Sequence, residues 1–177
     1  SVCIGRSAGH GVNAKNADDS VIIGARACSG LSGTYNDDCV VIGSDSGIGG
    51  TGASSIAIGD TASAKGDRNI SVGKNANLNS TSTQSISIGS KEINSGFNNA
   101  TSDEGIGYGS IAIGTSANGV ANSSVKRGDL SVMIGGACCY NGIAVNSVAI
   151  GALAGTTNPP AEGTVSIGFN AGSGTSA

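Results

Sequence analysis

Residues Ser55-Ile56-Ala57-Ile58-Gly59 and Asn69-Ile70-Ser71-Val72-Gly73 follow the same five-position pattern. A small polar residue comes first, two β-branched aliphatic residues flank a usually small one, and a glycine comes last. Ten such segments occur along the chain, at 1–5, 20–24, 39–43, 55–59, 69–73, 85–89, 110–114, 131–135, 147–151 and 164–168. So many matches in one chain indicate an internal repeat, which is typical of solenoids.

The spacing between successive motif glycines varies, from the shortest between Gly59 and Gly73 to the longest between Gly89 and Gly114. This variation indicates a short basic unit that carries insertions, and insertions in solenoids form loops on one side. The longest insertions lie at about 90–110 and 117–130. Neither composition nor motif order changes abruptly, so we read residues 1–177 as a single repeat domain.

Each motif has the two-residue period of a short strand. Val2 and Ile4 are expected to point one way and Cys3 the other, with Gly5 turning a tight corner. Weaker second strands are expected at 62–64 and 76–78, where small and polar residues alternate. Stacking such coils would bury the aliphatic pairs as a continuous ladder. The fold class predicted is all-β, a parallel β-roll or β-solenoid of about ten short coils.

The middle strand position is often small, as in Ala57, Ser71, Ser87, Ala112 and Ala149. A row of small side chains allows close packing against another backbone, which would indicate self-association, for example around a threefold axis. The same row would also be suitable for facing water. The residues alone leave both readings open.

The composition excludes several classes of protein. Aromatic residues make up 3% and charged residues 12%, so a thick globular core is not expected. The net charge is −3 and the nine Lys and Arg residues are scattered, which argues against nucleic acid as a partner. No apolar run is long enough for a membrane helix. The chain starts at Ser1 without a signal peptide, so a processed protein or a fragment is expected.

The chain has five cysteines and a single histidine, His10. The absence of a Cys-x-x-Cys pair weakens a zinc interpretation. The cysteines are candidates for small core residues or for one or two disulfides. These candidates are Cys3, Cys28, Cys39, Cys138 and Cys139.

Two acidic pairs, Asp18-Asp19 and Asp37-Asp38, precede motif strands in the same register. Stacked carboxylates could hold Ca²⁺, although solvated loop charges are the simpler reading. No set of acid, base, nucleophile or metal ligands converges in the sequence. We therefore expect no enzyme activity, no cofactor and no established metal site.

The longest insertions contain the best candidates for partner contact, because aromatic and arginine side chains concentrate binding energy. These candidates are Phe97, Tyr108, Lys126 and Arg127. Phe97 and Tyr108 could instead pack their own loops against the roll.

The motif series, from Ser1 to about Ala171, resembles the head repeats of trimeric autotransporter adhesins, the YadA-like heads, and similar rolls occur in phage tail fibres. The resemblance implies a left-handed parallel β-roll, three intertwined chains and a place on an extracellular surface. It also implies binding of host cells, matrix proteins or surface glycans without catalysis. The chain departs from that family in having no heptad stalk, neck or membrane anchor, longer insertions and more cysteines.

A filament is the alternative. Joining the end of one copy to the start of another would separate Gly168 from the next Gly5 by the same interval that separates Gly59 from Gly73, the shortest within the chain. Coils could then stack end to end, and the chain would be a structural subunit of an extracellular filament.

Overall fold

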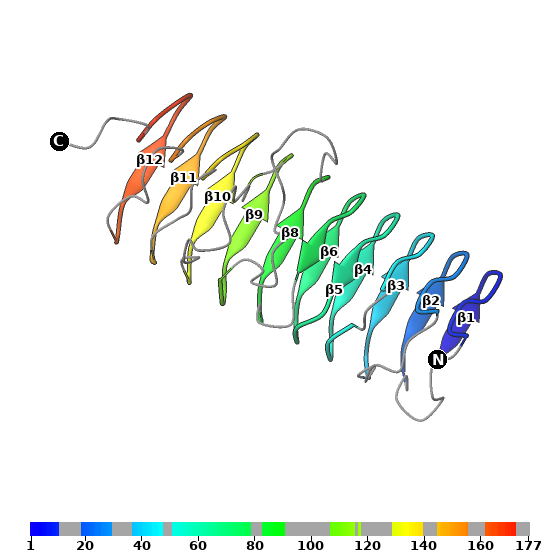
Figure 1. The fold of residues 1–177 in the computed structure, drawn as a ribbon. Coiled ribbons are helices and arrows are strands. Elements are labelled where there is room, and N and C mark those ends of the chain that lie inside the picture. The colour runs from blue at the N-terminus through cyan, green and yellow to red at the C-terminus, as the bar shows by residue number, and fades with distance from the viewer. Residues whose placement is uncertain are drawn as a thin grey trace.

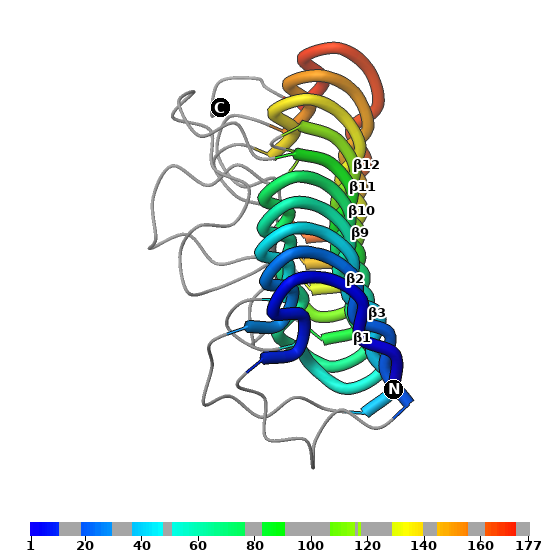
Figure 2. The backbone as a smooth tube through the Cα atoms, turned by 90° about the vertical axis from the view of Figure 1, so that its right-hand side faces the viewer, coloured from blue at the N-terminus to red at the C-terminus, as the bar shows by residue number. Residues whose placement is uncertain are grey.

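The computed structural model describes residues 1–10, 19–29, 37–47, 51–78, 83–90, 107–115, 117, 129–139, 145–155 and 162–172. Within these residues the protein is a β-solenoid without a helix, and its turns stack along one axis (Figures 1 and 2). The all-β solenoid expected from the repeat is therefore confirmed. No helix in the described part of the chain is both long and apolar enough to span a membrane.

The ten motif segments supply the ten strands of one parallel sheet (Figure 1). Their order in the sheet follows their order in the chain, and equivalent motif positions pair throughout, for example Ile56 with Ile70. The strands are β1 (Val2–Ile4), β2 (Val21–Ile23), β3 (Val40–Ile42), β4 (Ile56–Ile58), β6 (Ile70–Val72), β8 (Ile86–Ile88), β9 (Ile111–Ile113), β10 (Val132–Ile134), β11 (Val148–Ile150) and β12 (Val165–Ile167).

The weaker second strands are also confirmed. β5 (Ser63–Ala64) and β7 (Asn77–Leu78) pair in parallel as a separate two-stranded sheet. They follow the two successive motif glycines that are closest in sequence, Gly59 and Gly73. A second, shorter strand therefore forms in these units, which carry no long insertion.

The side chains point in the direction opposite to the one expected. In the ten-stranded sheet, the middle residue of each strand from β2 to β12 is buried, including Ala57 and Ser71, which are fully enclosed. The flanking pair, such as Ile56 and Ile58, is only half-buried and lies on the outer face. The prediction of an internal aliphatic ladder was therefore wrong, although the two-residue period was right.

The narrow interior explains this reversal. The middle residues face the residue three positions after each motif glycine, and that residue is buried and small in Ala27, Ser46, Ala62, Ala76 and Ala154. Most middle positions hold Ala or Ser, and the interior admits larger side chains at only a few of them, Ile22, Val41 and Met133. Where one wall carries a larger side chain, as at Met133, its neighbours Ala112 and Ala149 are small. Close packing at fixed volume thus sends the bulky residues outward.

The motif glycine is required by a close approach between coils. Gly59 has a φ of 135°, and a Cβ built on it would lie 2.4 Å from the carbonyl oxygen of Gly73. The same stacking recurs from Gly5 to Gly151, because every coil turns the same corner directly above the next. Only glycine fits this position without moving a backbone.

The residue before each strand links neighbouring coils through its side chain. The Ser85 amide donates to Asn69 Oδ1 at 2.9 Å, and the Ser147 amide donates to Ser131 Oγ at 3.2 Å. Each of these residues is buried. The small polar residue that opens the motif is therefore an internal hydrogen-bond acceptor, which a strand-periodicity argument does not reveal.

Candidate interaction surfaces

The outer face of the ten-stranded sheet is the largest uniform surface of the molecule. All of its flanking strand positions are Val or Ile. In parallel pairing, each residue lies beside its equivalent on the next strand, as Val132 does beside Val148. We call these two rows the aliphatic face. At a strand spacing of about 4.8 Å, it extends for about 43 Å.

The aliphatic face is apolar and only half-covered. Its side chains are half-buried on the inner strands, apart from the exposed Ile88, and the end strands expose them further: Ile4 is 56% exposed and Ile167 is 67% exposed. Continuous apolar surface of this extent marks interaction sites on soluble proteins. The small middle residues expected to serve this purpose are buried inside the coil instead.

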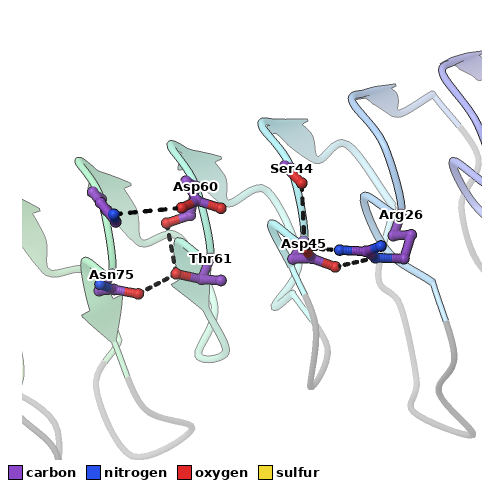
Figure 3. A network of polar contacts seen from close by, with 7 residues as sticks. Arg26, Ser44, Asp45, Asp60, Thr61 and Asn75 are labelled. Atoms are coloured by element: carbon purple, nitrogen blue, oxygen red, sulfur yellow. Dashed lines mark hydrogen bonds and ion pairs between the residues drawn. The ribbon is translucent and has the colours of Figure 1, made fainter.

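A polar corner borders the aliphatic face at the two positions after each motif glycine. Arg26 and Asp45 occupy the same corner position on adjacent coils, with Arg26 Nε donating to Asp45 Oδ1 at 2.6 Å and Nη2 donating to Oδ2 at 2.5 Å (Figure 3). Ser44 Oγ also donates to Asp45. The hydrogen bonds from Arg26 hold the pKa of Asp45 below its usual value. This bidentate pair ties the coils of β2 and β3 together from outside.

The same corner continues onto the next coils. Thr61 Oγ1 donates to Asn75 Oδ1, and Lys74 Nζ lies 4.0 Å from Asp60 Oδ2 (Figure 3). These side chains are exposed, so each pair is worth little in stability. Beside β11 and β12 the corner carries large apolar residues: Leu153 is 36% exposed and Phe169 is 78% exposed. The corner is thus polar beside β2 to β6 and carries an exposed apolar side chain beside each of β11 and β12.

A second edge holds the described residues that flank the insertions. In the sequence, each insertion lies between a motif glycine and the next motif strand. The described residues that flank the insertions hydrogen-bond from coil to coil, as Leu130 N does to Tyr108 O at 2.8 Å and Asn146 N does to Asp129 O at 3.0 Å. The starts and ends of the insertions therefore line one edge of the coil.

Tyr108 is the one proposed partner-contact residue that the structure describes. Its hydroxyl donates to Gln84 Oε1 at 2.6 Å, its amide donates to Asp129 Oδ1, and its side chain stays partly exposed. Tyr108 therefore packs along the insertion edge while still presenting its ring. Phe97, Lys126 and Arg127 lie outside the described residues.

Three of the four candidate calcium ligands lie in the part of the chain that the structure describes. Asp19, Asp37 and Asp38 are exposed, and Asp18 lies outside the described residues. Among the residues that the structure places, no three His, Cys, Asp or Glu side chains are close enough to share a metal ion. Asp19 and Asp38 instead adopt positive φ values, 52° and 64°, at the corner before the strand.

All five cysteines are in the thiol form, and four of them are buried. Burial raises the pKa of Cys28 to about 12, and burial also raises the pKa of Cys39. Cys39 takes the place of the motif serine, and its thiol donates to Gly52 O at 3.0 Å. Cys3, Cys28 and Cys39 thus behave as small residues of the coil, while Cys138 and Cys139 lie in contact with each other.

Sequence reasoning missed both the aliphatic face and the buried acceptor row. The flanking positions are all Val or Ile, while the middle position varies from Ser to Met. A two-residue period separates these two faces but does not say which of them lies inside.

Comparison with known proteins returned no relative. No protein-family model matches this chain, and no curated protein or solved structure matches it. The likeness to adhesin head repeats therefore stays a prediction.

Proposed function

We propose that this protein is a non-enzymatic extracellular head or fibre segment that assembles with copies of itself through the aliphatic face and presents its insertions to a binding partner. The observation that carries the proposal is the aliphatic face, which is built only from Val and Ile over ten strands. A surface of that kind is costly to leave in water and is stabilised by burial against a matching surface.

The division of the coil into two edges supports this proposal. The aliphatic face consists of strand residues only, and the described residues that flank the insertions lie along another edge. A trimeric left-handed arrangement, as in the adhesin heads that the motifs resemble, would bury the aliphatic face. It would leave the insertion edge exposed to solvent. Host cells, matrix proteins or surface glycans would then meet the insertions.

Assembly is tested by light scattering and negative-stain imaging of the native protein. In the variant Ile111→Lys a charge is placed on the aliphatic face, and burying it unpaired would be strongly unfavourable. We expect a discrete oligomer for the natural chain and a monomer for this variant. The matched control is Thr115→Lys, which adds the same charge at an exposed residue of the same coil.

Two results would contradict assembly through this face. One is a folded natural chain that stays monomeric at all concentrations. The other is equal loss of assembly in Ile111→Lys and Thr115→Lys. Binding is tested separately, with immobilised collagen and fibronectin as probes and Tyr108→Ala as the variant, for which we expect weaker binding and unchanged assembly.

The alternative function is a filament subunit, and the edges of the sheet favour it. Within the sheet, Val148 N donates to Thr164 O and Gly168 N donates to Ile150 O, both at 2.8 Å. β12 presents the same donor and acceptor, Val165 N–H and Ile167 C=O, at its outer edge. β1 presents the complementary Ser1 C=O and Gly5 N–H at the opposite edge, so imaging of long unbranched polymers would favour this function.

A further inference from the structure

Cys138 and Cys139 lie side by side within one corner of the coil, and Cys138 comes four residues after Ile134, the last residue of β10. Both side chains are fully buried, and their sulfur atoms are 3.6 Å apart. The Cys138 thiol points to the carbonyl oxygen of Ala149 at 3.3 Å, and the Cys139 amide donates to Ala154 O at 2.8 Å. Adjacent cysteines thus both face the interior instead of pointing to opposite sides, as they would along a strand.

The backbone conformation of Cys139 is the second observation. Its φ is 56°, in the left-handed region, and other coils place glycine at this position, with φ values of 66° at Gly9, 70° at Gly47 and 67° at Gly155. Left-handed conformations are unfavourable for residues with a Cβ. Cysteine is therefore less favourable than glycine in this conformation, but it brings its sulfur beside that of Cys138.

We propose that Cys138 and Cys139 are a modification site, where the two thiols are joined as a vicinal disulfide in an oxidising environment. Its natural occurrence depends on the extracellular location proposed above, but its chemistry does not. Such a bond would keep two thiols of the folded rod from exchanging with other chains. Since both sulfurs are enclosed, it would form while this coil is still open during folding.

The reaction is a thiol–disulfide exchange with a small-molecule or protein disulfide. One Cys thiolate attacks the oxidant and forms a mixed disulfide, releasing the first reduced thiol. The neighbouring thiolate then attacks this mixed disulfide, closing the Cys138–Cys139 bond and releasing the second thiol. In total, the protein loses two hydrogen atoms, that is, two protons and two electrons, and the oxidant gains them.

The geometry also sets the main obstacle. Adjacent Cα atoms are about 3.8 Å apart, which is shorter than the usual separation in disulfides. Closing the bond therefore requires both side chains to turn toward each other within the corner. Gly136, two residues before Cys138, has open space around its Cα and provides backbone freedom for this adjustment.

The test refolds reduced, denatured protein in a buffer of reduced and oxidised glutathione, quenches it with acid and alkylates it in denaturant without reductant. We expect three alkylated cysteines, Cys3, Cys28 and Cys39. The peptide that holds Cys138 and Cys139 should be lighter by two hydrogen atoms and should become alkylated only after reduction. The same labelling on folded protein exported to an oxidising compartment makes the result independent of refolding.

Cys28 is the matched internal control, because it occupies the same repeat position as Cys139, with a φ of 50°, but has Ala27 and Ser29 as neighbours. In Cys139→Ser, the remaining Cys138 should become alkylated. Full alkylation of Cys138 and Cys139 without reduction, stable glutathione adducts, or pairing with another cysteine would overturn the proposal. Light scattering of the same oxidised sample tests assembly separately, so that failure of one proposal is distinguishable from failure of the other.

Discussion

At the scale of single residues, the coil depends on positions where adding or removing one side-chain atom changes the stability of the fold. The motif glycines stack so closely that a side-chain carbon on one would overlap the carbonyl of the next. The residue before each strand must offer an acceptor inside the coil, and Ser and Asn do so. These requirements repeat in every unit, so a single substitution can be compared with an equivalent site elsewhere in the same chain.

Gly59→Ala is expected to lower the free energy of unfolding by more than about 3 kcal/mol, because the added carbon meets the Gly73 backbone and the φ of 135° is unfavourable for alanine. Urea unfolding followed by circular dichroism measures this loss. Gly136→Ala is the control, since a Cβ there meets nothing within 4 Å. An equal loss in both variants would show that glycine stacking is not the cause.

Asn69→Ala is expected to cost about 1 to 3 kcal/mol, because it leaves the buried Ser85 amide without the acceptor that Asn69 Oδ1 provides at 2.9 Å. Asn69→Ser restores the residue found in most other repeats and should recover most of this stability. Thermal unfolding of the two variants checks the difference. Asn69 also begins an Asn-x-Ser sequon, and its complete burial predicts that it carries no glycan.

At the scale of the strand, the two faces have opposite requirements. The inner face accepts only the volume that the opposite wall leaves free, and the outer face accepts any residue that fits beside its equivalents on the neighbouring strands. Exposed ion pairs at the polar corner add a weak second connection between coils. Both features can be tested within β2 to β4.

Ala57→Leu is expected to destabilise the protein by about 1 to 3 kcal/mol or more, because Ala57 is fully buried in a narrow interior that cannot admit the extra carbons. Ile56 precedes Ala57 in the strand but lies on the aliphatic face. The substitution Ile56→Leu keeps the side-chain volume and should cost less than about 1.5 kcal/mol. The urea midpoints of the two variants provide the comparison. A larger effect for Ile56→Leu would mean that the faces are assigned the wrong way round.

The Arg26–Asp45 pair predicts a pH dependence. Because the pKa of Asp45 is lowered in the folded protein, the pair stabilises the fold above the pKa of an unfolded aspartate, about 4, and this contribution disappears as the pH falls below it. The melting temperature between pH 7 and pH 2 measures this loss. In Arg26→Gln and in Asp45→Asn we expect a smaller fall over the same range, and an unchanged fall in both would contradict the role of the pair.

At the scale of the whole molecule, the solenoid is a thin rod whose largest apolar surface is on the outside. Its stability as a single chain rests on hydrogen bonds between coils and on small buried side chains. The side chains of the aliphatic face become fully buried only when another surface covers the sheet. Folding and assembly are therefore expected to be coupled.

This coupling predicts that the melting temperature rises with protein concentration, by about 2 to 4 °C for a tenfold increase. Differential scanning calorimetry over two decades of concentration provides the measurement. Ile111→Lys should unfold at a lower temperature that does not depend on concentration. A melting temperature of the natural chain that is independent of concentration would argue against assembly.

The sequence by itself determined the repeat, the two-residue period, the parallel stacking in register and the positions of the second strands after Gly59 and Gly73. These features follow from local patterns that recur along the chain, so they need no knowledge of the opposite wall. Only the tertiary structure decided which face of each strand lies inside. That choice depends on the distance between the two walls of the coil, which leaves space for Ala57 and Ser71 but not for Ile56 and Ile58, and no local pattern contains that distance.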